Sequence, residues 1–259
     1  AVGTLKTVME IAENTPELRE AGRNIARAAQ TVTALVNNCL LPIAAVNYGF
    51  ERGRRYFQDR FHEDFARKVE SIPPENLQEP KASIASQILQ GLTFAHEEVE
   101  LKELYLNLLK QSMDSRVSNQ AHPAYVEILR QITAEEARLL NGILQSDGLL
   151  PIVEIRRNVN PTGGYQVLKS NIMSAFDTTT KKPVVIADLS AKVDNWCRLG
   201  LITVSYERHL TDERLYDWVK GWPEYVELVS PHPDGEAFPK NGVLTVTSFG
   251  KAFARAVAD

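Results

Sequence analysis

The sequence predicts a mainly α-helical protein with a small α+β part. Up to residue 147, apolar residues recur at spacings of three and four, which is the period of one helical face. After residue 150 the chain becomes rich in proline, glycine and β-branched residues, with short runs typical of strands. We therefore expect two domains, a helical region at 1–147 and an α+β domain at 148–259.

The first predicted helices form a long arm. An apolar stripe at helical spacing runs from Ile25 to Phe50, and Gly53 is expected to break the helix. The stripe then resumes in four residues spaced four apart: Phe57, Phe61, Phe65 and Val69. The arm should end at residues 71–74 (SIPP), because the residue before a proline is disfavoured in a helix.

Three or four shorter helices are expected next. Apolar stripes predict two of them, over 83–95 and 97–113. Thr133 and Glu136 form a capping box, in which a threonine is followed three residues later by a glutamate. This box predicts a helix that begins there and ends at Gly148.

The second domain is predicted to combine strands with helices. Residues 158–164 should be a loop, and Pro183–Leu199 should be a helix or helix pair ending at Gly200. Asn241-Gly242 is typical of a hairpin turn. Three strands and a terminal helix complete the prediction: 201–206, 225–230, 242–249 and 248–258. This order of elements resembles a winged helix-turn-helix domain.

Composition sets limits on function. The chain has 259 residues, of which 44% are hydrophobic and 24% charged, which is ordinary for globular domains. Its net charge of -4 excludes a protein that binds polyanions by bulk electrostatics. Cys39 and Cys197 form no CxxC or CxxH pair, so we expect a reducing cytoplasm rather than a disulfide framework. Peripheral attachment to the inner membrane is the alternative location.

The sequence offers no positive case for an enzyme. His62 and His96 are each followed by glutamate, but the second histidine of a zinc-protease motif is missing from both. Phosphate-binding loops, nucleophile elbows and cysteine–histidine pairs with a known spacing are also missing. We therefore predict no catalytic residues, no cofactor and no metal site.

One long segment lacks charge altogether. Residues 28–50 are 23 consecutive uncharged residues, long enough to cross a bilayer as a helix. Three asparagines and a proline argue against a lone membrane span, because unpaired amides are costly in hydrocarbon. They are Asn37, Asn38, Asn47 and Pro42.

Both faces of this helix are expected to be covered. One face is strongly apolar, and the other is uncharged and carries amides, whereas a face in water usually carries charge. The cover could be the protein's own helices, a partner chain or second copy, or a membrane surface. The candidate interaction residues are Asn37, Asn38, Arg52, Arg54 and Arg55.

Nucleic acid is a disfavoured partner. The helix that would serve for recognition, over 188–198, carries two acidic and two basic residues: Asp188, Asp194, Lys192 and Arg198. Helices that bind DNA normally present several cations, since phosphate neutralisation dominates affinity.

Several long stretches together resemble the abortive-infection alpha family of bacterial proteins. They are AGRNIARAAQTVTALVNNCLLPIAAVNYGFERGRRYF (21–57), IPPENLQEPKASIASQILQGL (72–92), LKELYLNLLKQSMDSR (101–116), AHPAYVEILRQITAEEA (121–137) and LTVTSFGKAFARA (244–256). The resemblance implies a role in defence against bacteriophage and supplies no catalytic residues.

The resulting hypothesis is an antiphage defence protein that acts without catalysis. It would sense an infection product or bind a partner effector, so a protein partner or a phage component is expected. One alternative is a membrane-disrupting effector whose 28–50 helix inserts on activation. A second alternative is a nucleic-acid-binding regulator that uses the winged-helix-like domain.

Overall fold

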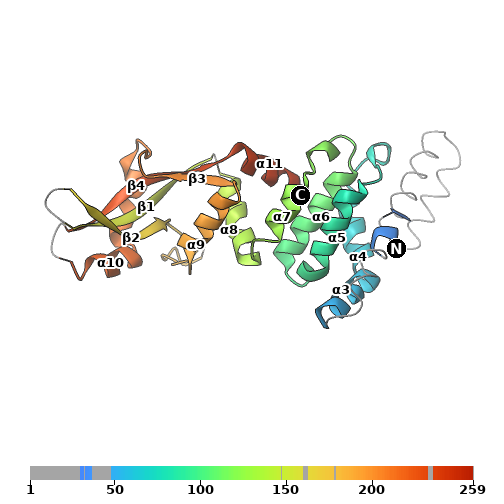
Figure 1. The fold of residues 1–259 in the computed structure, drawn as a ribbon, viewed down its shortest axis with the longest axis horizontal. Coiled ribbons are helices and arrows are strands. Elements are labelled where there is room, and N and C mark those ends of the chain that lie inside the picture. Colours follow the sequence, from blue (N-terminus) through green and yellow to red (C-terminus); the bar gives the residue numbers. More distant parts are fainter. Residues whose placement is uncertain are drawn as a thin grey trace. The chain divides into compact units, whose positions relative to one another are not determined.

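A computed structural model describes most of the chain after residue 47. The described residues are 30–31, 33–36, 48–146, 148–159, 163–177, 179–232 and 236–258. They form two compact units (Figure 1). The first unit holds the described residues up to Leu139 together with those from Ala252 onward, and the second runs from Leu140 to Lys251.

The first unit is built from helices. Its longer elements are α3 (Tyr48–Asp59), α4 (Phe61–Val69), α5 (Ala82–Ala95), α6 (Val99–Met113) and α7 (Pro123–Leu129). Short 3-10 turns η2 (Pro74–Asn76) and η3 (Ser118–Gln120) lie between them. Helices α8 (Ala134–Leu144) and α11 (Ser248–Val257) each contribute residues to both units.

Helix α6 lies at the centre of this unit and packs against α4, α5 and α7. The predicted stripes of α5 and α6 are confirmed as core: Ile88, Leu92, Leu108 and Leu109 are fully buried. On α4, Phe61 and Phe65 stack with ring centroids 5.4 Å apart and an interplanar angle of 6°. The four-residue spacing of the phenylalanines therefore buried them on one face, as expected.

The prediction that Gly53 breaks the first arm is wrong. Helix α3 runs through Gly53, and the break falls at Arg60, between α3 and α4. Gly53 is buried where α3 meets α5, and a Cβ atom there would lie 2.6 Å from the Thr93 carbonyl oxygen. Glycine at this position serves close helix approach, not a turn.

The predicted capping box is confirmed. The Glu136 amide donates to Thr133 Oγ1 at 3.2 Å, and Glu136 Oε2 accepts from the Thr133 amide at 2.8 Å. These reciprocal bonds pair two backbone N–H groups that the start of α8 leaves unpaired.

The second unit contains a four-stranded antiparallel sheet with the strand order β2-β1-β4-β3. Its strands are β1 (Leu149–Asn158), β2 (Tyr165–Ile172), β3 (Ile202–Ser205) and β4 (Ala237–Val246). Helices α9 (Leu189–Arg198) and α10 (Pro223–Val229) and the 3-10 helix η4 (Glu213–Gly221) lie between strands in the sequence. Strands β1 and β2, which the sequence prediction missed, flank the expected 158–164 loop.

Two other predictions for this unit are wrong. Residues 225–230 were expected as a strand but belong largely to α10, because Pro223 occupies its first turn and favours a helix start. Asn241-Gly242 was expected as a hairpin turn but lies inside β4, paired with Val153 and Ile152 of β1. A Cβ atom at residue 242 would lie 2.5 Å from the Tyr206 ring, so this glycine serves close packing.

The fold is therefore a mixed α and β one, with helices predominating in the first unit. The winged-helix part of the prediction is not confirmed. Within the described residues between β2 and β3 the structure has one helix, α9, whereas a helix-turn-helix requires two.

Most of the uncharged 28–50 segment lies outside the described residues. Its described parts, 30–31, 33–36 and 48–50, are helical. Thr31 Oγ1 donates to Glu79 Oε1 at 2.8 Å, and Val36 is buried. Within the part of the chain that the structure describes, no helix combines the length and apolarity that a membrane crossing requires.

Candidate functional site

The arginines predicted as interaction residues lie on α3 and differ in their surroundings. Arg52 Nη1 donates to both carboxylate oxygens of Glu97 at 2.9 Å. Arg54 and Arg55 are exposed, and no carboxylate of the described residues forms an ion pair with either. Asn37 and Asn38 lie outside the described residues. All three arginines are exposed, but Arg52 is tied to Glu97 in the segment that follows α5, whereas Arg54 and Arg55 are adjacent on α3 and form no such pair with a described carboxylate.

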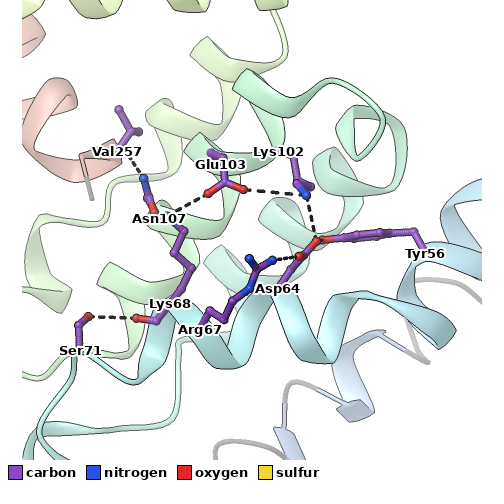
Figure 2. A network of polar contacts seen from close by, with 9 residues as sticks. All are labelled: Tyr56, Asp64, Arg67, Lys68, Ser71, Lys102, Glu103, Asn107 and Val257. Atoms are coloured by element: carbon purple, nitrogen blue, oxygen red, sulfur yellow. Dashed lines mark hydrogen bonds and ion pairs between the residues drawn. The ribbon is translucent and has the colours of Figure 1, made fainter. Parts of the chain in front are cut away.

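Charged side chains of α4 and α6 form a half-buried network (Figure 2). Lys102 Nζ lies 3.0 Å from Asp64 Oδ2, and Arg67 pairs with the other oxygen of that carboxylate. Lys68 Nζ lies 2.9 Å from Glu103 Oε2. The network therefore joins α4 to α6 through charges of opposite sign.

Tyr56 joins α3 to this network. Its hydroxyl donates to Asp64 Oδ2 at 3.3 Å, and its ring stacks on His96 with centroids 5.0 Å apart. Burial, followed by the negative charge of Asp64, raises the Tyr56 pKa far above its usual value. Burial alone would also raise the pKa of Asp64, but Lys102, Arg67 and the Tyr56 hydroxyl outweigh it and hold that pKa below its usual value. Tyr56 thus stays a donor and Asp64 an anion.

The first unit contains a pocket of about 490 Å³ between α5, α6 and the end of α7. These three helices pack side by side (Figure 1). Half of the lining is apolar and buried, from Gly91, Ala95, Leu101, Leu129 and Ile132. A volume of this size falls in the range of roughly 300–1,000 Å³ typical of small-molecule sites.

Tyr105 supplies a buried polar group to this pocket. The residue is 2% exposed, and no described residue hydrogen-bonds its hydroxyl. Burial raises the Tyr105 pKa to about 12, with Arg130 opposing the shift and Glu127 adding to it. The hydroxyl is therefore protonated at neutral pH and can donate to a group that enters the pocket.

Three further residues supply the charged and aromatic groups of the pocket. Arg130 donates to Glu127 Oε1 at 2.9 Å and to Gln90 Oε1 at 2.8 Å, so its guanidinium is held in place. Glu98 is exposed, and among the described residues its carboxylate forms no ion pair with Arg130. Phe94 at the rim is 60% exposed. The pocket thus combines an aromatic face, a cation and an anion on apolar walls.

Sequence patterns predicted which part of this pocket is buried, but they did not identify its charged and aromatic groups. Tyr105 belongs to the predicted stripe of α6 and is buried as expected. Arg130 and Phe94 were not singled out, because they belong to different helices and only the fold brings them to one pocket. The one local signal was Phe94 itself, a large aromatic side chain off the buried stripe of α5.

Among the described residues no group of three or more histidine, cysteine, aspartate or glutamate side chains could hold a metal ion. Of the histidines that the sequence prediction considered, His62 is exposed and His96 bonds the Thr93 carbonyl oxygen at 2.9 Å through Nδ1.

Comparison with known proteins gives one match. A family model described as abortive infection alpha matches residues 53–257, which include the network, the pocket and the sheet. Searches among curated proteins and among solved structures find no match.

Proposed function

Because the chain belongs to the abortive infection alpha family, which indicates a role in abortive-infection defence, we propose that it acts there by binding. In this proposal the protein is a sensor. The pocket between α5, α6 and α7 takes up a small product of infection, and catalysis is not required.

The Tyr105 hydroxyl, which no described residue pairs, is the observation that carries this proposal. Although Tyr105 as a residue is 2% exposed, its hydroxyl oxygen is open to water in the pocket. A ligand that accepts a hydrogen bond from this hydroxyl would replace that water, and the apolar walls would strengthen the bond. Replacement by phenylalanine keeps nearly the same shape and removes only this donor.

Pairing of the charged groups supports binding over catalysis. Arg130 is engaged by Glu127 and Gln90, and Asp64 by Lys102. A carboxylate that is held ionised by a cation is a weak base, and a fixed guanidinium is suited to orienting a ligand. These pairs therefore favour recognition.

We expect Tyr105→Phe to weaken protection against phage without loss of stability. The variant removes one hydrogen bond to the ligand, which corresponds to a roughly three- to ten-fold loss of affinity. The measurement is the efficiency of plating on cells that carry the protein, together with the thermal midpoint of the purified chain. The thermal midpoint should be equal to or above that of the wild type.

Tyr56→Phe is the matched control, since it removes the hydroxyl of another buried tyrosine of the same unit outside the pocket. It breaks the bond to Asp64, so it should cost about 1 kcal/mol and leave protection intact. Unchanged protection in Tyr105→Phe, or equal loss in both variants, would overturn the sensor proposal.

A second candidate function, binding of an acidic partner effector, is favoured by Arg54 and Arg55. Both are exposed on α3, on the side away from buried Gly53, Tyr56 and Phe57. Two neighbouring guanidinium groups that no described carboxylate pairs are suited to carboxylate recognition.

For this candidate the double variant Arg54→Glu/Arg55→Glu should abolish protection while the fold is retained. Charge reversal at a partner surface places like charges together, and this lowers the association rate. The control is Lys81→Glu/Arg138→Glu, which makes the same change in net charge at exposed positions of the same unit. An equal efficiency of plating on cells that carry either double variant would contradict a role for Arg54 and Arg55 of α3 in protection.

Two further functions, membrane disruption and nucleic-acid binding, remain proposals. Insertion of the 28–50 helix depends chiefly on residues outside the described part of the chain. Binding of nucleic acid would use α9, where Lys192 and Arg198 flank Asp194. Vesicle leakage would support the first, and salt-dependent DNA binding would support the second.

A further inference from the structure

The pocket of the first unit has an exposed rim and buried walls. The lining residues with charged, amide or phenyl side chains are all exposed and form the rim: Gln90, Phe94, Glu98 and Arg130. The lining residues that are buried form the walls: Gly91, Ala95, Leu101, Tyr105, Leu129 and Ile132. A ligand that enters therefore meets apolar surface inside and charge only at the rim.

Among the described residues of these walls, Tyr105 alone carries a polar side-chain group. Gly91 of α5 fixes where that group lies, because a Cβ atom at Gly91 would be 2.6 Å from the Tyr105 hydroxyl oxygen. The phenol thus packs directly against the α5 backbone, and its oxygen is open to the pocket. The walls offer a ligand one hydrogen-bond donor at one fixed position.

The charged groups of the rim do not suit an anionic ligand. Arg130 Nη1 donates to Glu127 Oε1 at 2.9 Å. Its Nη2 atom donates to Gln90 Oε1 at 2.8 Å and to the Gln87 carbonyl oxygen at 3.4 Å. The guanidinium therefore has no edge with two free donors, and Glu98 adds a negative charge to the rim. An anion between the walls would lose its hydration and gain one neutral donor, which does not compensate for the loss.

A cationic group is unsuited to these walls for a different reason. Ammonium and guanidinium groups donate hydrogen bonds and accept none, so neither can accept from Tyr105. A neutral carbonyl, ester or amide oxygen accepts that bond and costs far less to bury than an ion. The apolar walls then cover the rest of the ligand, since dry apolar cavities take up apolar molecules.

We propose that this pocket binds an uncharged, mainly apolar molecule that carries a hydrogen-bond acceptor, with the acceptor at the Tyr105 hydroxyl and the apolar body against the walls. An apolar cavity of about 150 Å³ is enough to bind benzene, so a pocket of about 490 Å³ accommodates a body larger than one ring. The biological meaning of this inference rests on the proposed sensor function. Its chemistry is testable on the purified full-length chain without phage.

The test is a ligand-detected NMR titration of the full chain with four flat probes of nearly the same shape: acetophenone, α-methylstyrene, benzoate and benzamidine. Acetophenone is neutral and carries a carbonyl acceptor, which α-methylstyrene replaces by a carbon–carbon double bond. Benzoate is an anion, and benzamidine is a cation at neutral pH. We expect acetophenone to bind about ten-fold or more tightly than either ion, because the walls do not compensate a buried charge.

Tyr105→Phe should weaken acetophenone by roughly three- to ten-fold and leave α-methylstyrene unchanged, because only the ketone uses the hydroxyl. Comparison of the two probes separates the lost hydrogen bond from any general change in the pocket, which would affect both. Tyr56→Phe is the matched control, since it removes a buried tyrosine hydroxyl that does not line the pocket. It should leave the affinities of both probes unchanged.

Benzoate or benzamidine that bound as tightly as acetophenone would overturn the inference. So would an equal response of acetophenone and α-methylstyrene to Tyr105→Phe, or no binding of acetophenone at millimolar concentration. If Tyr105→Phe still abolished protection in any of these cases, the sensor proposal would stand with a ligand of another class. If acetophenone behaved as expected but Tyr105→Phe kept full protection, the ligand class would stand and the sensor proposal would fail.

Discussion

Replacement of Gly250 by alanine is expected to destabilise the second unit by about 3 kcal/mol, at the upper end of overpacking effects. Gly250 lies in the first turn of α11, where its amide donates to Thr247 Oγ1 at 2.8 Å. A Cβ atom at this position would overlap the Leu201 carbonyl oxygen and lie 3.0 Å from its carbon. Backbone atoms cannot rotate away as a side chain can, so α11 must shift from the start of β3.

Tryptophan fluorescence during denaturant unfolding measures this effect selectively. The chain has three tryptophans, Trp196, Trp218 and Trp222, and all lie in the second unit. The expected result is a lower midpoint at an unchanged slope. An unchanged midpoint would show that α11 does not need its close approach to Leu201.

Gly142→Ala is the control with the opposite sign. It is the same substitution in a helix of the same unit, and a Cβ atom there meets nothing within 4 Å. Alanine loses less conformational entropy than glycine, so stability should rise by about 0.5–1 kcal/mol. Comparison of Gly250→Ala with Gly142→Ala separates the destabilisation caused by a steric clash from the stabilisation that alanine gives to a helix.

Gly53 and Gly242 show where sequence-based prediction failed. Both were interpreted from local patterns, as a break and as a turn, and both serve close packing against residues distant in the sequence. Gly53 meets Thr93, and Gly242 meets Tyr206. Glycine permits either use, and the choice depends on a neighbour that only the folded chain supplies.

Features encoded within one or two turns were predictable. The capping box of Thr133 and Glu136 depends on residues three apart, and the stripes of α5 and α6 depend on a 3.6-residue period. The pocket lacks such a signature, because Phe94, Tyr105 and Arg130 come from different helices. Burial of Tyr105 was predictable from its stripe, but the missing partner of its hydroxyl among the described residues was not.

Asp64→Asn is expected to destabilise the first unit by about 2–3 kcal/mol, somewhat less than the loss of a partner in a fully buried ion pair. The substitution keeps the shape but removes the charge that faces Lys102 and Arg67 (Figure 2). The Asp64 and Lys102 side chains are 12% and 18% exposed, so solvent weakens the penalty without cancelling it. Far-UV circular dichroism of the denaturant transition measures the loss. Asp59→Asn, at an exposed position of α3, should change stability by less than about 0.5 kcal/mol.

The pH dependence of this difference identifies its cause. The pKa of Asp64 is lower in the folded protein than in the unfolded chain, so the ionised form stabilises the fold. That contribution is complete above the unfolded value of about 4 and is lost as the pH falls through the folded value. The difference in stability between wild type and Asp64→Asn should therefore be constant near neutrality and shrink below about pH 4. A difference that persisted unchanged into strong acid would mean that the carboxylate acts through packing, and that its charge does not join α4 to α6.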